Sequence, residues 1–356
     1  MPTLFDPLQL GDLSLPNRII MAPLTRCRAE PGRIPGDLMV DYYRQRASAG
    51  LIISEATSVT PMGVGYPDTP GIWSDAQVEG WKKVTAAVHE AGGRIILQLW
   101  HVGRISDPLY LDGATPVAPS ALQPAGTVSR LRPQKTYVTP RALDISEIPG
   151  VIEAYRQGAA NARAAGFDGV EIHAANGYLI DQFLQSSTNR RNDAYGGSLE
   201  NRARLLLEIT DAILEVWAPG LVGVHLSPRG DSNDMGDDQP QETFGYVAEA
   251  LDRRGIAFLC LREYEGPDSL ASAIRGKFSG RFIANEALDQ AQAAAWLAQE
   301  RADAVAFGKL FIANPDLPAR FAHGAALNAP RPETFYTPGP EGYTDYPALE
   351  QCGAET

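Results

Sequence analysis

The sequence predicts an α/β fold, namely a single (β/α)8 barrel (TIM barrel) over residues 1–356 with a long capping loop after its third strand. Short apolar runs rich in β-branched residues alternate with amphipathic helical patterns. This alternation is typical of a parallel sheet with helical crossovers. Eight such units in about 300 residues fit one closed barrel. A doubly wound sheet is the alternative, but the first apolar run ends in APLTR and lacks the Gly-rich fingerprint of that fold.

Eight runs are expected to form the barrel strands because each is too short for a helix and is bounded by Gly, Pro or charged residues. They are Arg18–Leu24, Leu51–Ala56, Arg94–Trp100, Gly169–Ala174, Leu221–Ser227, Ala257–Glu263, Arg281–Glu286 and Ala302–Gly308. Helices are expected at Asp75–Ala91, Asp144–Ala165, Leu199–Trp217 and Gln241–Arg254. The first of these has a capping signal at Ser74 and a stop at Gly92-Gly93.

One connection, residues 101–143, is unusually long. It is rich in Pro, Ser and Gly and has no helical period. A loop of this length in a compact domain is usually functional. Because it leaves the carboxyl end of the third strand, we expect it to cap the mouth of the barrel.

The composition is that of a globular enzyme, with 44% hydrophobic and 21% charged residues. The net charge of −12 argues against a nucleic-acid partner, since phosphate backbones require a basic surface. There is no apolar run of about 18 residues and no secretory signal pattern, so no membrane partner is expected. The widely spaced Cys27, Cys260 and Cys352 form no C-x-x-C motif. They predict free thiols and a cytoplasmic location.

Polar residues are concentrated at the carboxyl ends of the predicted strands, where enzymes of this fold place their sites. They are Thr25, Gln98, His173, Asn176, His225, Arg262, Glu263, Asn285 and Lys309. Strand ends also become polar simply because they meet water. Two His, an Asn and a Gln within otherwise apolar strands favour a functional site.

His173, Asn176 and Tyr178 form the strongest group. A spacing of three fits one helical turn after the strand, so that His173 and Asn176 can point at one spot. A neutral imidazole and an amide each offer a hydrogen-bond donor, and two donors suit an oxygen that gains negative charge. Tyr178 adds a hydroxyl that can supply a proton. A core His bonded to a backbone carbonyl, with an Asn in a turn, is the structural alternative.

Longer strings identify the chain as similar to the Old Yellow Enzyme family, close to its xenobiotic reductase and N-ethylmaleimide reductase branch. The resemblance runs nearly end to end. It rests on LFDPLQLGDLSLPNRIIMAPLTR, YYRQRASAGLIISEAT, PGIWSDAQVEGW, QLWHVGR, EIHAANGYLIDQFLQSSTNRRNDAYGGSLENRARLLLEI, FIANPDLPAR and GYTDYP. Strings of this length are far more specific than a three-residue motif.

The resemblance implies a barrel that holds non-covalent FMN at the carboxyl ends of its strands. NADPH or NADH reduces the FMN, leaves, and is replaced by a small electrophilic substrate in a ping-pong cycle. Hydride then passes from the flavin to the β-carbon of an activated alkene such as an enone, maleimide or nitroalkene. Nitrate esters and nitroaromatics are further candidate substrates. A monomer and a homodimer would both fit.

The resemblance also implies roles for individual residues. His173 and Asn176 match the pair that binds the activating oxygen, and Tyr178 matches the proton donor. The flavin contacts that it implies are Pro23, Leu24, Thr25, Ala56, Gln98, His225, Asn285, Gly308 and Lys309. The positions that it implies for the substrate pocket, besides His173 and Asn176, are Tyr66, Trp100 and Tyr343.

Two positions depart from the commonest pattern of the family. His225 stands where many members have Arg at one edge of the flavin, and a His is not a permanent cation. Flavin binding could therefore depend on pH, unless Arg229 or Gln98 compensates. Lys309 stands where many members place Arg on the FMN phosphate, and Lys can bind phosphate as a point charge. Main-chain N–H groups around Asn285 and Gly308 are expected to complete that site.

The sequence is also compatible with three other kinds of protein. A zinc hydrolase would use His101, His173 and His225 with Asp231 and Glu263, but the chain has no H-x-H or H-x-x-x-H pair. A flavin-binding sensor or store would not need the complete set of His173, Asn176 and Tyr178. A Schiff-base aldolase would use Lys309 as nucleophile, although a phosphate contact is the more ordinary role for this lysine.

Overall fold

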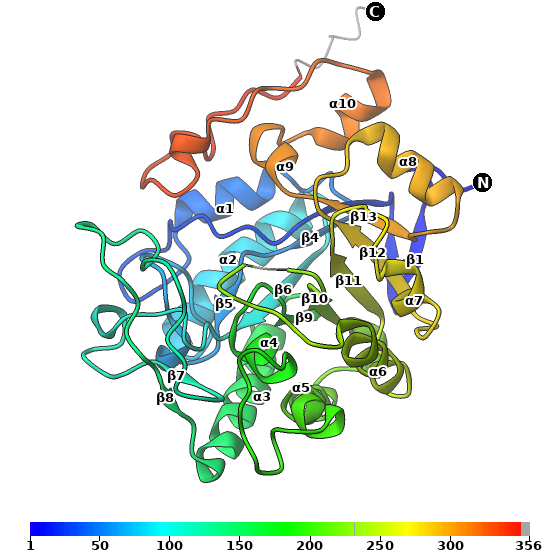
Figure 1. Cartoon of the computed structure of the whole chain (residues 1–356). Helices are drawn as coiled ribbons and strands as arrows, with labels where there is room; N and C mark the ends of the chain where they lie inside the picture. The colour runs from blue at the N-terminus through cyan, green and yellow to red at the C-terminus, as the bar shows by residue number, and fades with distance from the viewer. Residues whose placement is uncertain (231, 350–356) are drawn as a thin grey trace, which may run out of the picture.

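A closed barrel of parallel strands forms the centre of the molecule (Figure 1). The computed structural model describes residues 1–230 and 232–349. In chain order the barrel strands are β3 (Ile19–Met21), β4 (Leu51–Ile53), β6 (Ile95–Trp100), β9 (Val170–Ala174), β10 (Val222–Leu226), β11 (Phe258–Arg262), β12 (Arg281–Asn285) and β13 (Ala304–Phe307). β13 pairs with β3, and β4 pairs with β6, which closes the ring. The predicted barrel is therefore confirmed.

The barrel strands are apolar because both of their faces are covered. Every residue of β6, β9 and β10 is buried. The side chains that fill the barrel interior include Ile20, Ile53, Ile96, Cys260 and Ile283. The observed strands are shorter than the predicted runs, because the chain leaves the ladder as it turns into the loops of the mouth. The second strand is also interrupted at 54–56 and resumes as β5 (Thr57–Ser58), which pairs with β6.

A hairpin that the sequence analysis did not predict lies at the amino end of the barrel. It consists of β1 (Leu8–Leu10) and β2 (Leu13–Leu15), which pair in antiparallel fashion. Its leucines join the cluster of side chains that fills the barrel interior. Gly11 turns the hairpin with φ +56°, and a Cβ at this position would lie 2.2 Å from the carbonyl oxygen of Gly220. The backbone of the turn therefore packs directly against the start of β10.

Helices surround the barrel in Figure 1. They are α1 (Asp37–Arg44), α2 (Asp75–Glu90), α3 (Ile148–Ala164), α4 (Leu179–Leu184), α5 (Leu199–Leu214), α6 (Pro240–Asp252), α7 (Ala271–Arg275), α8 (Gln290–Ala298), α9 (Lys309–Ala313) and α10 (Leu317–His323). The four predicted helices correspond to α2, α3, α5 and α6. The prediction placed the start of α3 too early, because Asp144 caps a separate 3-10 turn over Ile145–Glu147. Among the residues described, no helix combines the length and hydropathy that a membrane span requires.

The long connection after β6 covers one side of the carboxyl end of the barrel, as predicted. It contains a 3-10 turn (Pro108–Tyr110) and two short paired strands, β7 (Val117–Ala118) and β8 (Arg141–Ala142). Its buried side chains Val102, Ile105, Val128 and Tyr137 pack in one cluster with Trp100. This cluster attaches the capping loop to the end of β6.

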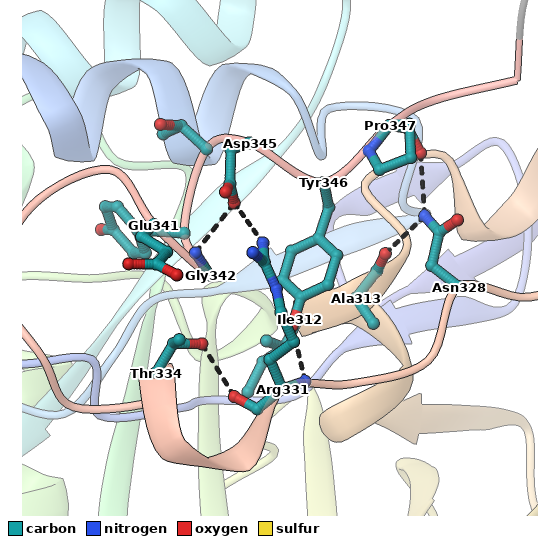
Figure 2. A network of polar contacts seen from close by, with 12 residues as sticks. Ile312, Ala313, Asn328, Arg331, Thr334, Glu341, Gly342, Asp345, Tyr346 and Pro347 are labelled. Atoms are coloured by element: carbon teal, nitrogen blue, oxygen red, sulfur yellow. Dashed lines mark hydrogen bonds and ion pairs between the residues drawn. The ribbon is translucent and has the colours of Figure 1, made fainter.

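The C-terminal segment, residues 325–349, runs beside α1 and α9 (Figure 1) and is fixed by the polar network in Figure 2. The carboxylate of Asp345 accepts hydrogen bonds from Arg331 (2.5 Å) and from the backbone of Gly342 (2.8 Å). Asn328 donates to the carbonyls of Ala313 and Pro347, both at 2.8 Å. The capping loop also reaches this segment, since the Arg130 guanidinium lies 3.6 Å from the centroid of the Tyr336 ring.

Arg26, which follows β3, anchors the C-terminal segment to the barrel. Its side chain is buried and donates to the carbonyls of Phe335 (3.1 Å) and Gly342 (2.7 Å). Its guanidinium also lies 5.1 Å from the ring of Tyr42 and 5.0 Å from the ring of Tyr343. Hydrogen bonds from charged donors to buried carbonyls are among the stronger ones in proteins.

We expect Arg26→Met to lower the free energy of unfolding by about 2–4 kcal/mol, since it removes these hydrogen bonds and the cation–π contacts together. Urea denaturation measures this change. Arg44→Met is the matched control, because Arg44 is exposed and its ion-pair partner among the residues described is the exposed Asp41. The control is expected to lose less than about 1 kcal/mol. Equal losses in the two variants would contradict the anchoring role of Arg26.

Candidate active site

The neighbouring strands β6, β9 and β10 bring the central predicted residues together. His173 on β9 lies in register with His225 on β10, and their ring centroids are 5.6 Å apart. The indole of Trp100, at the end of β6, lies 6.4 Å from His173. The ring of Tyr178 meets His173 edge-on at 5.2 Å. The strand ends therefore form one continuous wall of aromatic and imidazole rings.

Three buried polar atoms in this wall are not satisfied by the residues described. They are Nδ1 of His173, Nε2 of His225 and Nε1 of Trp100. Buried polar groups in folded proteins almost always have a hydrogen-bond partner. Atoms of this kind on three adjacent strands fit a flat ligand that carries polar atoms along one edge, together with a second ligand above it.

Burial keeps His173 neutral, because it lowers the pKa of the imidazole well below its usual range, and the charges of His225 and Arg262 lower it further. A neutral imidazole has one donor and one acceptor nitrogen. His173 can therefore donate a hydrogen bond to a ligand oxygen without adding a full positive charge.

Asn176 lies in the turn after β9 and is held on both sides of its backbone. Its φ is +60°, a left-handed conformation that Asn adopts more easily than most residues. Its N–H donates to the hydroxyl of Ser227 (2.7 Å), and its carbonyl accepts from the side chain of Asn233 (2.8 Å). These contacts fix the backbone of Asn176, and therefore the position of its Cα, close to the end of β10.

Tyr178 and Tyr66 share a hydrogen bond of 2.8 Å between their hydroxyl groups. Both rings also pack on Trp100, with centroid distances of 4.9 Å for Tyr178 and 5.5 Å for Tyr66. Burial raises the pKa of Tyr178 well above its usual value and that of Tyr66 to about 12. Tyr178 thus stays protonated at neutral pH and can act as a proton donor.

His225 is paired with a buried carboxylate. Its Nδ1 lies 3.6 Å from Oε2 of Glu171, which also accepts a hydrogen bond from Gln98 (2.7 Å). Burial by itself lowers the pKa of His225, but the interactions with Cys260 and Glu171 outweigh it and raise this pKa to about 10. The raised pKa favours the imidazolium form of His225, which would supply positive charge at the position where the family commonly has Arg.

This raised pKa makes the stability of the protein depend on pH. An imidazole in the unfolded chain releases its proton near pH 6.5, whereas folded His225 keeps it up to about pH 10. The stabilisation from this proton is complete below the lower value and is lost as the pH rises through the higher one. Between pH 6.5 and about 8.5 the free energy of unfolding is expected to fall by up to about 1.4 kcal/mol per pH unit from this group.

Urea denaturation of the holoenzyme across this range checks the expectation. The matched comparison is the double variant Glu171→Gln with His225→Gln, in which both charges of the pair are replaced by amides. Its free energy of unfolding should vary less with pH than that of the parent protein. Parallel pH profiles would show that His225 does not hold an extra proton in the folded state.

The remaining residues expected to contact FMN lie along an arc of neighbouring strand ends. Pro23, Leu24 and Thr25 follow β3 and are half-buried, while Ala56 lies in the interruption between β4 and β5. Asn285 ends β12, and Gly308 and the exposed Lys309 follow β13. Since β12, β13, β3 and β4 are consecutive in the barrel, these positions surround one part of the mouth. The arrangement fits an FMN.

Tyr343 is the one predicted pocket residue that does not join Tyr66 and Trp100. Its side chain is fully buried and stacks on Tyr42 with a centroid distance of 4.1 Å. The guanidinium of Arg28 lies 4.4 Å from the centroid of the Tyr343 ring. In the structure the Tyr343 ring therefore packs the C-terminal segment against α1.

Arg262 is a site residue to which the sequence analysis assigned no role. Its Nη1 donates to Oδ1 of Asn176 at 2.6 Å, and its Nε is paired with the carboxylate of Glu286. An Arg at the end of an apolar strand was a visible signal. Its partners are not visible in the sequence, because they lie on the loops after β9 and β12.

The geometry does not support the zinc interpretation. Among the residues described, the potential metal ligands that lie within 4.8 Å of one another are Glu171, His225 and Cys260. His101 accepts a hydrogen bond from the backbone of Gly103, and Glu263 is paired with Arg229. Asp231 lies outside the described residues.

The cysteines are free thiols where the structure describes them, as the sequence predicts. Cys27 and Cys260 are buried free thiols, and Cys352 is outside the described residues.

Comparison with known proteins identifies the family. The sequence profile of the NADH:flavin oxidoreductase / NADH oxidase family matches residues 3–328. The chain belongs to this family. Its members include a probable flavin mononucleotide-dependent alkene reductase from Leishmania infantum, 43% identical over 358 residues, with 97% of each chain covered. The 12-oxophytodienoate reductase 1 of Oryza sativa subsp. japonica is 42% identical over 365 residues, which cover 99% of this chain and 95% of that protein.

Solved structures agree with this assignment. Morphinone reductase in complex with tetrahydroNAD is 54% identical, with a TM-score of 0.95 and 99% of each chain covered. The old yellow enzyme homologue from Zymomonas mobilis is 47% identical, also with a TM-score of 0.95, covering 98% of this chain and 100% of that one. The protein is thus a flavin oxidoreductase of the Old Yellow Enzyme type with FMN as cofactor and a nicotinamide as hydride donor.

Proposed function

We propose that this flavin oxidoreductase reduces the C=C bond of electrophilic alkenes such as enones, maleimides and nitroalkenes at the expense of NADPH or NADH. The observation that supports this most directly is the packing of His173 and Tyr178 against Trp100 at the mouth of the barrel, with Asn176 in the turn between His173 and Tyr178. FMN, when bound, supplies the hydride chemistry, and the protein supplies position and electrostatics. Pro23, Leu24, Thr25, Ala56, Gln98, His225, Asn285, Gly308 and Lys309 are proposed to hold it.

His173 and Asn176 are proposed to bind the carbonyl or nitro oxygen of the substrate. Hydride addition at the β-carbon moves negative charge to this oxygen. Donors that are already in place for this charge lower the barrier, and each typically contributes about 10²–10³ in rate. The nicotinamide carboxamide oxygen is proposed to use the same two donors in the other half-reaction.

Tyr178 is proposed to give its hydroxyl proton to the α-carbon. The hydrogen bond that it shares with the Tyr66 hydroxyl orients this group, and the Trp100 ring packs against both phenols. The capping loop adds Val128 and Tyr137 to the same cluster and so shields the Tyr66 and Tyr178 rings from water on one side. Tyr66 and Trp100 are therefore proposed to line the substrate pocket.

Rapid mixing under anaerobic conditions tests the proposal. The purified FMN-loaded protein is reduced with NADPH and, separately, with NADH, and is then mixed with an enone, a maleimide, a nitroalkene or a nitrate ester. We expect flavin reduction by at least one nicotinamide and rapid re-oxidation by the alkenes. Flavin that is reduced by nicotinamides but is re-oxidised by oxygen alone would reject the alkene reductase assignment. Re-oxidation by nitrate esters or nitroaromatics would extend the substrate range.

The whole chain is proposed to act as one FMN-binding domain in the cytoplasm. The two buried cysteines are unpaired thiols, which supports a reducing compartment. The site uses residues of one chain, so that a monomer and a homodimer are both compatible with it. Sedimentation velocity distinguishes the two states.

A further inference from the structure

The amide of Asn176 can adopt two orientations that differ by a half-turn, and only one of them presents N–H groups to a ligand. Oδ1 accepts hydrogen bonds, whereas Nδ2 donates them. The proposed function, on which this inference rests, requires that Nδ2 faces the substrate oxygen. Something must therefore hold Oδ1 on the other side.

Arg262 contacts the Asn176 amide at 2.6 Å through Nη1. A guanidinium has five N–H donors and no acceptor. The atom of Asn176 that lies next to it must therefore be the oxygen, because two N–H groups at this distance would repel each other. With Oδ1 fixed on Arg262, the Nδ2 group has to point to the opposite side of the planar amide.

Arg262 is itself held in place. Its Nε forms an ion pair with Glu286, the residue that follows β12. Glu286 has a φ of +110°, an unusual backbone conformation for a non-glycine residue. The guanidinium is only about one-third exposed and the carboxylate less, at 32% and 18%. The three side chains thus form a chain of contacts across the ends of β12, β11 and the loop after β9.

We propose that Arg262 is a positioning residue for alkene reduction, which fixes the Asn176 amide so that its N–H groups face the substrate oxygen. The guanidinium also polarises this amide, since a hydrogen bond that an oxygen accepts from a cation makes the attached N–H groups stronger donors. Arg262 acts through Asn176, and Glu286 acts through Arg262.

The test uses a para-substituted phenol, whose phenolate oxygen would take the place of the substrate oxygen and whose stacking on oxidised FMN would give a long-wavelength charge-transfer band. Arg262→Gln is compared with the parent holoenzyme. We expect the dissociation constant for the phenol to rise about tenfold, and the apparent pKa of the bound phenol, read from the charge-transfer band, to rise as well. Arg262→Lys, which keeps a cationic donor, should recover part of the affinity. Unchanged values in Arg262→Gln would overturn the proposal.

Arg229→Gln is the matched control for charge. Arg229 follows β10, lines the same 190 Å³ cleft as Arg262, and is paired with Glu263 and Asp268, whereas Arg262 contacts Asn176. It should leave the phenol affinity within about twofold of the parent value. An equally large effect in Arg229→Gln would show that Arg262 contributes only general charge, which contradicts the proposal.

A double-mutant cycle decides whether Arg262 acts through Asn176. In an Asn176→Gly background, which suits the left-handed backbone, Arg262→Gln should change phenol affinity by less than twofold. An undiminished tenfold effect in this background would overturn the proposal. Circular dichroism and FMN content, measured on every variant, identify misfolding. Parent protein that binds no phenol would instead reject the proposed function, so the two failures can be told apart.

Discussion

Replacing His173 and Asn176 together by alanine is expected to abolish tight phenol binding and to slow flavin re-oxidation by an enone by about 10²–10³ for each donor removed. Both side chains are proposed to donate to the oxygen that becomes negatively charged. His173 is neutral and has no partner among the described residues for its Nδ1. Phenol titration and anaerobic rapid mixing measure the two effects.

The backbone of Asn176 requires a control for this experiment. Alanine in a left-handed conformation is strained by about 1–2 kcal/mol, so that part of the loss could come from a shifted turn. His173→Ala with Asn176→Gly removes the same two donors without this strain. If the glycine version kept the phenol affinity of the parent protein, the assignment of these two donors would be wrong.

Tyr178→Phe is expected to slow the reduction of an enone by about 10²–10⁴, the usual range for the loss of a general acid, while flavin reduction by NADPH stays nearly unchanged. The reason is that only the alkene half-reaction needs a proton at carbon. Separate rapid-mixing measurements of the two half-reactions check this. Nitrate esters should be less affected, because their first reductive step does not protonate carbon.

Tyr66→Phe is the matched control for Tyr178→Phe. It removes the hydrogen-bond partner at 2.8 Å but leaves the Tyr178 hydroxyl in place. We expect a smaller loss of alkene reduction than in Tyr178→Phe. Equal losses in both half-reactions of Tyr178→Phe would show that this tyrosine has a structural role instead.

The barrel was predictable because its strands are buried on both faces and therefore appear as apolar runs. The hairpin at Leu8–Leu15 was missed although Leu8, Leu10, Leu13 and Leu15 alternate around a Gly-Asp turn. Each of its strands has three residues, which is too short for a periodicity to stand out. The 3-10 turn before α3 was missed because Asp144 looks like the cap of the helix itself.

The core of the site was predictable because His173, Asn176 and Tyr178 are close in sequence and follow one strand. Arg262 was recognised only as a polar strand end. Its contact with Asn176 joins residues 86 positions apart, and no local pattern encodes such a pairing. For Tyr343 the resemblance implies a place in the substrate pocket. In the structure its ring stacks on Tyr42, a contact that no local pattern in the sequence encodes.

The hairpin at the amino end of the barrel has a kinetic consequence. Its leucines fill the interior from that side, so ligands are expected to approach FMN from the carboxyl end of the barrel. The nicotinamide and the alkene are proposed to use the same donors there, and each must leave before the other can enter. An excess of either one should therefore act as a competitive inhibitor of the other, and the best turnover should occur at a balanced ratio of the two.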